Sequence, residues 1–488
     1  MKKTLLTIIM MTLCGSIYGA ETDTLTLTLG DAIDIARQNS PSAQSARNTF
    51  LSAYWNYRYF RANYLPSVAL TSSPYINKEM NKITQSDGTA MFIRQDQFGA
   101  DLTLKINQNI SLTGGSIFLK SSLNRLDELQ NGTTAYSSQP LVIGYEQNLF
   151  GYNSLKWDRK IEPIRYREAK KQYAETLELI SASTCNQFFS LASAVNELDM
   201  ARQNFASADT LYHMAQGRYE IGTITENEML QLEINRLNEE TNVMDAEINL
   251  REAEQSIRSF LGMDDNVCIG LSMPDSVPDF QVPVMRAMDL ALSNSPDPDY
   301  YDRIIRQGES NLAYAKANAR IKADLYVQFG LSQTGKDIGQ SLSHLMHQEY
   351  ASVTLSVPIL DWGRGRGKVK EAQSQLALAQ TTADQGMNDF RQNVEKLVMQ
   401  FNMQARKVSI ASLTARRSTQ RHTVAMKLFV MGRVGILDLM NAITEKNVAK
   451  RNFIHTMSTY WSLYYTLRSM TAYDFEHNIP LTETLPLD

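Results

Sequence analysis

Residues that could carry out catalysis are few in this chain of 488 residues, and their spacing suits no familiar mechanism. The six histidines include no His-x-x-x-His or His-Glu pair, and the sequence lacks a Gly-x-Ser-x-Gly turn and a phosphate-binding loop. Cys185 and Cys268 match no zinc-ligand spacing, and each is expected to be a small buried apolar side chain. We therefore expect no enzyme activity, no bound metal and no cofactor.

Two other features could bind a ligand. The stretch from Gly363 to Gly367 reads Gly-Arg-Gly-Arg-Gly and follows a predicted strand, but it lacks the Lys-Ser/Thr of a phosphate loop. We interpret it as a flexible junction between a strand and a helix, with phosphate binding as the alternative. The 22 methionines are scattered through helical stretches, which indicates core packing rather than copper export.

Charge and the N-terminal sequence indicate the compartment. Lys plus Arg number 48 and Asp plus Glu number 52, so the net charge of −4 gives no electrostatic basis for binding nucleic acid. Residues 1–20 resemble a secretory signal peptide, with a positive start and a short apolar stretch before Ala20. Cys14 leaves a lipoprotein signal as the alternative. No other stretch of about 20 apolar residues exists, so we expect no helical membrane anchor.

The elements that must position any functional residue are very long helices. At about 1.5 Å per residue, an uninterrupted stretch of 53 residues would span roughly 80 Å. Gly222 and Gly432 separate such stretches in pairs and permit the chain to reverse. The stretches free of Gly and Pro are 164–216, 223–261, 387–431 and 436–479.

Helices of this length must pack against other helices along their length. Two of the stretches carry mostly apolar residues at spacings of three and four, a pattern typical of helix-to-helix seams. The first seam consists of Leu177, Ile180, Thr184, Phe188, Leu191, Val195 and Leu198, and the second of Leu230, Ile234, Leu237, Thr241, Met244 and Ile248.

The chain is predicted to be a duplication. Residues 32–41 recur at 287–296 with an offset of 255, whereas Gly222 and Gly432 are related by an offset of 210. The first copy is therefore 45 residues longer. Each copy is expected to open with one helix, at 29–62 and 284–318. The predicted organisation is a signal peptide at 1–20, a first repeat at 21–270, a second repeat at 271–474 and a tail at 475–488.

Segments of alternating polar and apolar residues predict strands with one face of each kind. Such strands suit a membrane barrel, in which the faces meet lipid and lumen, although a soluble sheet with one wet face would have the same pattern. The extra 45 residues of the first copy include a predicted hairpin near 97–130, which either adds strands to the barrel or lies outside it. The other predicted strands are 67–71, 141–145, 323–329 and 353–357.

In this order, the motifs resemble those of the TolC-like outer-membrane factor family, over nearly the whole chain from about Leu27 to Asp474. The motifs that carry the resemblance are Leu29-x-x-Ala32-Ile33-x-x-Ala36 with Asn39-Ser40-Pro41, Tyr64-Leu65-Pro66-Ser67, Val357-Pro358-Ile359-Leu360-Asp361-Trp362-Gly363 and Arg218-Tyr219-x-x-Gly222.

The resemblance implies an α+β fold, with a trimeric transmembrane β-barrel continued by a long periplasmic barrel of coiled-coil helices. Each subunit would contribute four strands to a shared barrel of 12. The homotrimer would lie in the outer membrane, in contact with its lipid, and extend into the periplasm. It would pass small molecules from an inner-membrane pump of RND or ABC type and a periplasmic adaptor. The alternatives are an exit duct for type I protein secretion and a periplasmic coiled-coil scaffold.

The resemblance also assigns roles to particular residues. The helical turns would form the periplasmic end, where carboxylates gathered around an axis repel one another and attract cations. The alternative is that these are solvated charges on the helix surface. The expected pore or gate residues are Asp438, Asn441, Glu228, Phe429 and Arg433; the adaptor-contact turns comprise Arg218, Tyr219, Gly222, Thr223 and Gly432; and the strand-to-helix junctions contain Pro358, Gly363 and Gly151.

Overall fold

The computed structural model describes residues 24–264, 267–274 and 276–481. The chain divides into two compact units, and the longest helices run through both. Residues 48–173 and 291–393 form the sheet unit, whereas the described residues within 24–47, 174–290 and 394–481 form the helical unit. The predicted signal peptide lies outside the described residues, as do residues 482–488 of the predicted tail.

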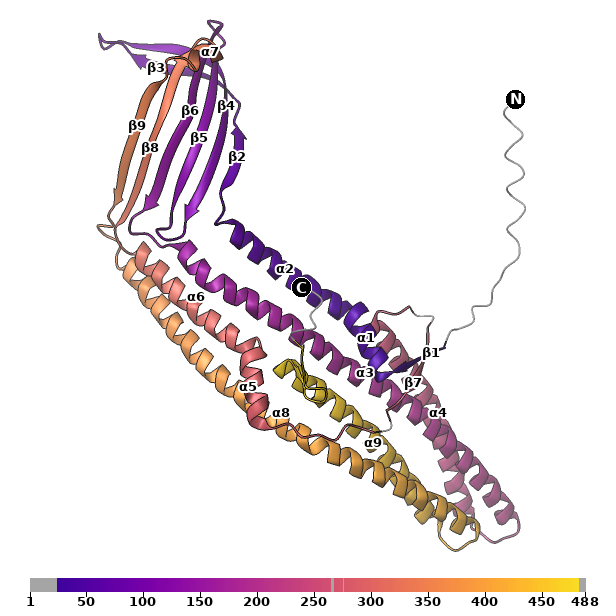
Figure 1. Cartoon of the computed structure of the whole chain (residues 1–488). Helices are drawn as coiled ribbons and strands as arrows, with labels where there is room; N and C mark the ends of the chain where they lie inside the picture. The colour runs from indigo at the N-terminus through magenta and orange to yellow at the C-terminus, as the bar shows by residue number, and fades with distance from the viewer. Residues whose placement is uncertain (1–23, 265–266, 275, 482–488) are drawn as a thin grey trace, which may run out of the picture. The chain divides into compact units, whose positions relative to one another are not determined.

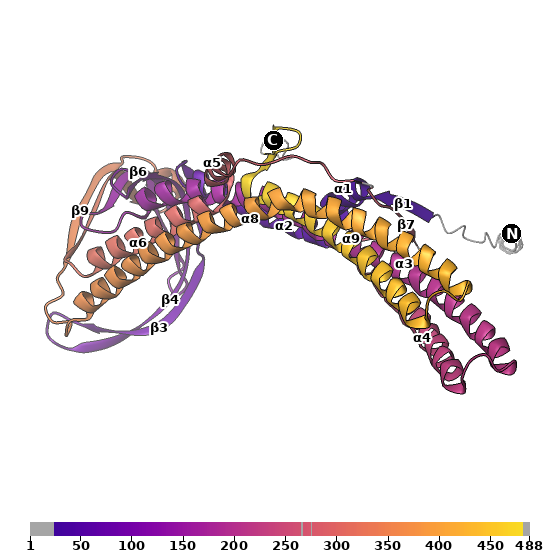
Figure 2. The ribbon, with the colours of Figure 1, turned by 90° about the horizontal axis from the view of Figure 1, so that it is seen from below.

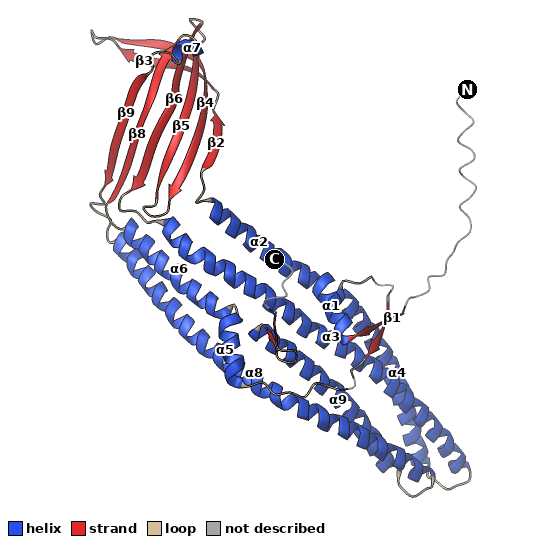
Figure 3. Cartoon of the chain, viewed as in Figure 1, coloured by secondary structure: helices blue, strands red, loops and turns tan. Residues whose placement is uncertain are grey.

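Eight of the described helices, drawn in Figures 1 and 3, fall into four pairs of equal length. Each half of the chain has helices of 11, 22, 67 and 36 residues in the same order, as a duplicated sequence would produce. None of the described helices is apolar enough over a sufficient length to cross a membrane. The pairs are α1 Leu29–Asn39 and α5 Val284–Asn294, α2 Pro41–Ala62 and α6 Asp297–Asn318, α3 Ser154–Glu220 and α8 Arg364–Val430, and α4 Glu226–Leu261 and α9 Ile436–Thr471.

The single helices predicted at 29–62 and 284–318 are each two helices. α1 ends at Asn39, and the backbone of the next residue, Ser40, is extended with φ −61° and ψ 146°. Pro41 follows, and a proline disfavours the helical conformation of the residue before it. The second copy breaks at the corresponding Ser295 and Pro296. The serine-proline pair therefore overrides the helical periodicity on both sides of it.

The longest helices exceed the predicted 53 residues, because glycine and proline do not end them. α3 continues through Pro163, and α8 contains Gly386. A side chain at Gly386 would lie about 2.1 Å from the hydroxyl oxygen of Tyr301 on α6. Gly386 therefore allows α6 and α8 to pack closely, which offsets its low helix propensity.

One antiparallel sheet dominates the sheet unit. β2 and β3 pair with successive parts of the long strand β4, so the sheet has six columns, in the order β2/β3, β4, β5, β6, β8 and β9 (Figure 1). The short helix α7, Ile338–Ser341, connects β8 and β9. The strands are β2 Ser67–Ser72, β3 Tyr75–Thr84, β4 Ala90–Ile110, β5 Gly115–Glu128, β6 Thr133–Asn148, β8 Lys322–Gly335 and β9 Met346–Ser356.

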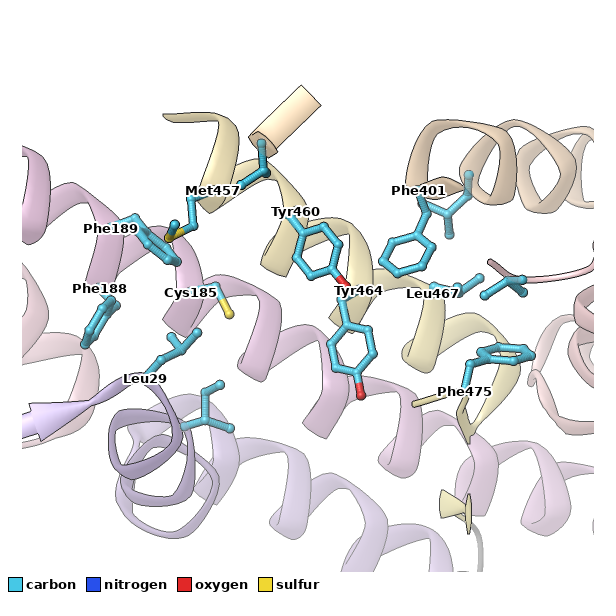
Figure 4. Close-up of a cluster of buried hydrophobic side chains, with 14 of the residues drawn as sticks. Leu29, Cys185, Phe188, Phe189, Phe401, Met457, Tyr460, Tyr464, Leu467 and Phe475 are labelled. Atoms are coloured by element: carbon cyan, nitrogen blue, oxygen red, sulfur yellow. The ribbon is translucent and has the colours of Figure 1, made fainter. Parts of the chain in front are cut away.

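The helical unit is built around an apolar core contributed by α1, α3, α8 and α9 (Figure 4). Phe188, Phe401 and Tyr460 are at most 1% exposed. Cys185 is also fully buried, as the sequence predicted, and this burial raises the pKa of its thiol. Two small sheets complete the unit: β1 Thr24–Thr28 with β7 Cys268–Ser272, and β10 Tyr473–Asp474 with β11 Ile479–Pro480.

Candidate channel surfaces and helical turns

The six-column sheet has one apolar and one polar face. Because side chains alternate along a strand, the paired residues Leu70 and Leu104 share a face with Ile106, whereas Lys105 points to the opposite face. The apolar face is exposed in the single chain and extends over every column of the sheet. It includes Val68, Leu70, Leu102, Leu104, Ile117, Leu119, Leu141, Ile143, Phe329, Val353 and Leu355.

The polar face carries a charge pair above an aromatic ring. The Nζ of Lys105 lies 3.9 Å from the Oε1 of Glu146 and 4.6 Å from the centre of the Phe118 ring. Phe118 is only 2% exposed because it lies over Gly144, where any side chain would collide with the ring. This arrangement spans β4, β5 and β6, so the extra strands carry the same polar surface as the rest of the sheet.

The predicted hairpin near 97–130 is longer than expected and lies within the sheet. β4 and β5 pair continuously from Gln97 with Glu128 to Ile110 with Gly115. They lie between β2/β3 and β6, so the first copy contributes four columns and the second contributes two. The four strands per chain that the family resemblance implied are therefore wrong for this protein, which has six columns.

The strand-to-helix junctions are more ordered than predicted. Gly363 has φ +83° and is the last residue before α8, so the following Gly-rich stretch forms the first helical turn and not a flexible linker. The carboxylate of Asp361 accepts hydrogen bonds from the backbone N–H groups of Gly365 and Gly363, which lower its pKa. Pro358 precedes this cap, and Gly151 lies at the corresponding junction before α3.

The first helical turn is tightly capped. Gly222 has φ +72°, and its N–H donates to the carbonyl oxygen of Tyr219 over 2.9 Å. The N–H and the hydroxyl of Thr223 both donate to the carbonyl oxygen of Arg218. Glu228 forms a capping box with Thr225, and these hydrogen bonds lower its pKa. Glu228 is thus exposed but engaged in capping α4 within one chain.

The second turn repeats the backbone geometry with fewer caps. Gly432 has φ +69°, and the Arg433 N–H donates to the Leu428 carbonyl oxygen over 2.9 Å. α9 then begins after Gly435 with no side-chain cap. Asp438, in the first turn of α9, is exposed and forms no ion pair among the described residues. Asn441 and Arg433 are also exposed, so these polar groups are available to other molecules.

Phe429 differs from the other predicted gate residues because it packs inside the helical unit. It lies against a small apolar cluster in which the two helical hairpins meet near their turns. Leu439 is the fully buried centre of this cluster, and Leu211 and Leu232 are 4% and 6% exposed. Within one chain, the Phe429 ring therefore packs against residues of both helical hairpins near their turns.

A buried basic site was not anticipated from the sequence. Lys446 on α9 is 4% exposed, and burial followed by repulsion from Lys450 lowers its pKa. Burial, followed by repulsion from Lys446 and then from Lys450, lowers the pKa of His422 on α8. The lysine occupies the buried face of α9 between Ala442 and Ala449. In the sequence, the only hint that Lys446 is buried is its position between Ala442 and Ala449 on one helix face. This hint is weak, because lysine at such a position also occurs on helix surfaces.

No group of three or more His, Cys, Asp or Glu side chains suited to a metal occurs among the described residues. Comparison with curated protein sequences gives no match. The fold is similar to solved outer-membrane channels, each of which shares about one residue in seven or eight with this chain.

The CmeC outer membrane channel of Campylobacter jejuni has 13% identity and a TM-score of 0.65, and the match covers 91% of this chain and 85% of CmeC. The outer membrane protein VceC of Vibrio cholerae has 14% identity and a TM-score of 0.63, with 91% and 95% covered. The open-state MtrE channel of Neisseria gonorrhoeae has 13% identity and a TM-score of 0.58, with 91% and 88% covered.

The family model of outer membrane efflux proteins matches residues 32–263 and 288–467, which together make up most of the chain. The two matched segments cover most of the two sets of equal-length helices described above. The chain therefore belongs to the outer membrane efflux protein family, and it is an outer-membrane efflux channel protein that extends into the periplasm.

Proposed function

We propose that three copies of the chain form a tunnel that passes small molecules out of the cell, and that it acts as a channel and not as an enzyme. A periplasmic adaptor and an inner-membrane pump would deliver the cargo to its helical end. The observation that carries this proposal is the two-faced sheet, whose apolar face is uncovered and whose edge strands, β2/β3 and β9, have no partner in the described chain. Strands of neighbouring copies would pair with these edges.

The number of strands sets the width of such a tunnel. Three copies with six columns each would give a closed barrel of 18 strands. With a strand spacing of about 4.8 Å and a tilt of about 40°, the backbone diameter is roughly 36 Å, against roughly 24 Å for 12 strands. The hairpin of β4 and β5 would thus widen the membrane end of the tunnel.

We further propose that the turn at Gly432 is the gate. Three copies of Asp438 around the axis would repel one another, so closure needs a partner such as Arg433 or hydrogen bonds of Asn441. Both charges are exposed and without an ion-pair partner among the described residues. Contacts with an adaptor would replace those links and move the turn outward.

The gate proposal is tested by replacing Asp438 and Arg433 with Ala and measuring single-channel conductance in planar bilayers. The double variant should conduct several-fold better than the wild type, because the closed-state links are removed. Asp199→Ala, an exposed carboxylate in the middle of α3, serves as the control and should leave conductance unchanged. Equal conductance of the gate variant and the wild type contradicts the assignment of the gate.

The tunnel itself is tested by fractionation and by an export assay. The wild-type protein should require detergent for extraction from the outer membrane and should migrate as a trimer that heat dissociates. Cells that lack it should accumulate small toxic compounds, and its return should reverse this. A monomer in the periplasmic fraction would contradict the tunnel and favour a scaffold.

A further inference from the structure

Two apolar seams were predicted in the first helical hairpin, and only one is covered by the chain itself. The seam on α3 is buried except at Val195, which is 41% exposed; the other six residues of this seam are at most 7% exposed. The seam on α4 faces outward along its whole length. Its apolar residues are between 44% and 59% exposed: Leu230, Ile234, Leu237, Met244 and Ile248. We refer to this surface as the α4 edge.

Acidic residues line both sides of the α4 edge. They lie directly beside the seam positions, where a coiled coil has charged residues that select its partner. α4 has nine acidic and three basic residues, which gives a net charge of −6. The flanking residues are Glu233, Glu240, Glu247 and Glu254 on one side and Asp245 and Glu252 on the other.

A second exposed seam, of opposite charge, runs along the C-terminal half of α8, which leads to the turn at Gly432. Residues 394–430 have seven basic and one acidic residue, which gives a net charge of +6. Arg406, Arg417 and Lys427 occupy positions of the seam itself, with Lys407 and Arg421 beside it. We refer to this surface as the α8 edge. Its apolar residues are between 49% and 64% exposed: Met399, Met403, Ile410, Leu413 and Val424.

The two edges belong to the outermost of four neighbouring helices. α4 packs on α3, where the Arg202 guanidinium lies 3.0 Å from the Glu247 carboxylate. α3 packs on α9, where Arg451 lies 2.7 Å from Glu197. α9 packs on α8, since the amide of Gln404 donates to a backbone carbonyl of α9 over 3.0 Å. Figure 2 shows the two hairpins side by side. Each edge is therefore open to a neighbouring molecule.

The seams also match in register. Leu230 lies eight residues after Gly222, and Val424 lies eight residues before Gly432. Met244 and Ile410 are each 22 residues from the same glycines. If the turns of two copies lie at the same level, the antiparallel helices α4 and α8 bring these seam residues opposite one another.

We propose that the α4 edge of one copy binds the α8 edge of the next copy. Apolar seams would supply the buried surface, and the opposite charges would select the partner edge. Two α4 edges or two α8 edges would repel, so the copies join head to tail, the arrangement that closes into rings. This inference rests on the proposed trimer and identifies which helices hold its periplasmic part together.

The test uses the full chain in detergent, with Met244→Cys on α4 and Ile410→Cys on α8, and a copper-phenanthroline oxidant. The two thiols of neighbouring copies should form a disulfide, with dioxygen as the oxidant, and give covalent trimers on a non-reducing gel. Chains with only one of the two cysteines should give none, which controls for Cys185 and Cys268. A native trimer without cross-links from the paired cysteines overturns the proposed edges.

Charge reversal then tests the selection of the partner. In the double-cysteine chain, Glu233, Asp245 and Glu252 are changed to Lys, or Arg406, Lys407 and Arg417 to Glu. No ion pair involves any of these six among the described residues. Each set should lower the initial cross-linking rate about tenfold at low salt, and the combined set should restore it. Glu239→Lys, off the seam, should change the rate little.

The outcomes separate this inference from the function on which it rests. A wild-type protein that is monomeric by native mass overturns the trimer itself. A trimer whose cross-linking is insensitive to both reversal sets and to salt between about 0.05 M and 0.5 M overturns the charge selection alone.

Discussion

At the scale of single residues, a buried charge network ties four parts of the helical unit together. The Glu178 carboxylate on α3 is 2% exposed and lies 3.1 Å from Arg37 on α1 and 2.9 Å from Arg468 on α9. Arg468 also lies 3.0 Å from Asp474, to which the Tyr464 hydroxyl donates over 2.7 Å. Because each charge is paired, removal of one partner leaves another buried and unpaired.

This network predicts a pH dependence of stability. Burial alone would raise the pKa of Asp474, but the hydrogen bond from Tyr464 and the charge of Arg468 hold it below its ordinary value of 3.8. Its contribution is therefore complete above about pH 4 and is lost as the pH falls through the lower folded-state value. The melting temperature should decrease over this range.

Asp474→Asn is the variant that isolates the effect. It should melt at a lower temperature than the wild type at pH 7, and the difference should shrink as the pH falls from about 4 through the lower folded-state pKa, where the wild-type carboxylate becomes protonated. Thermal unfolding followed by circular dichroism between about pH 7 and pH 2.5 measures this. A constant difference across the range would show that the Asp474 charge is not linked to folding.

At the scale of elements, the two helical turns need glycine because the backbone has a positive φ there, and not because a side chain would lack space. Gly222 and Gly432 both have φ near +70°, and nothing lies within 4 Å of a side chain built on either. Gly217 is the natural control, because it lies inside α3 with equally open surroundings. The three glycines therefore differ in backbone conformation alone.

Substitution with Ala should have opposite effects at these sites. Gly222→Ala and Gly432→Ala should each lower the free energy of unfolding by about 1 kcal/mol, because Ala is strained at positive φ. Gly217→Ala should raise it by about 0.5–1 kcal/mol through its greater helix propensity. Chemical denaturation of the purified protein measures all three. Equal effects at the three sites would contradict this account.

At the scale of the whole molecule, the extra hairpin is the feature that sets this chain apart from a simple duplication. β4 pairs with β2 and β3 on one side of the hairpin, and β5 pairs with β6 on the other, so removal of the hairpin takes out two of six columns. A chain without residues 88–131 keeps β2, β3 and β6, which can pair in the antiparallel sense. The proposed barrel would then fall from roughly 36 Å to roughly 24 Å in diameter.

The deletion of residues 88–131 is best made in the gate variant Asp438→Ala/Arg433→Ala, which is expected to conduct better than the wild type. The deletion should reduce the size of the largest polymer that can enter this channel from the outer side. Exclusion of polyethylene glycols of graded size, measured by their effect on conductance, gives this limit. The control is the same channel with a substitution at Gly132, in the turn between β5 and β6, and with no deletion. An unchanged size limit would contradict a barrel widened by the hairpin.

The sequence by itself determined the local elements. Periodicity and the glycines at 222 and 432 predicted the long helical hairpins, and alternation predicted the strands, because both signals depend on neighbouring residues. The breaks at Ser40 and Ser295 are also encoded locally, in the proline that follows each, although the helical periodicity continues across both. The ends of α3 and α8 were missed because Pro163 and Gly386 act as breakers only where packing does not compensate.

Only the tertiary structure decided which surfaces are covered. The seams of α3 and α4 have the same pattern, yet all residues of the first except Val195 are buried within the chain, whereas the second is exposed. Equally, the sequence left open whether the hairpin near 97–130 joined the sheet, and strand pairing placed it between β2/β3 and β6. Glu228 and Phe429 acquired capping and packing roles in the same way. Periodicity specifies that a face is apolar, but contacts between distant segments determine what covers it.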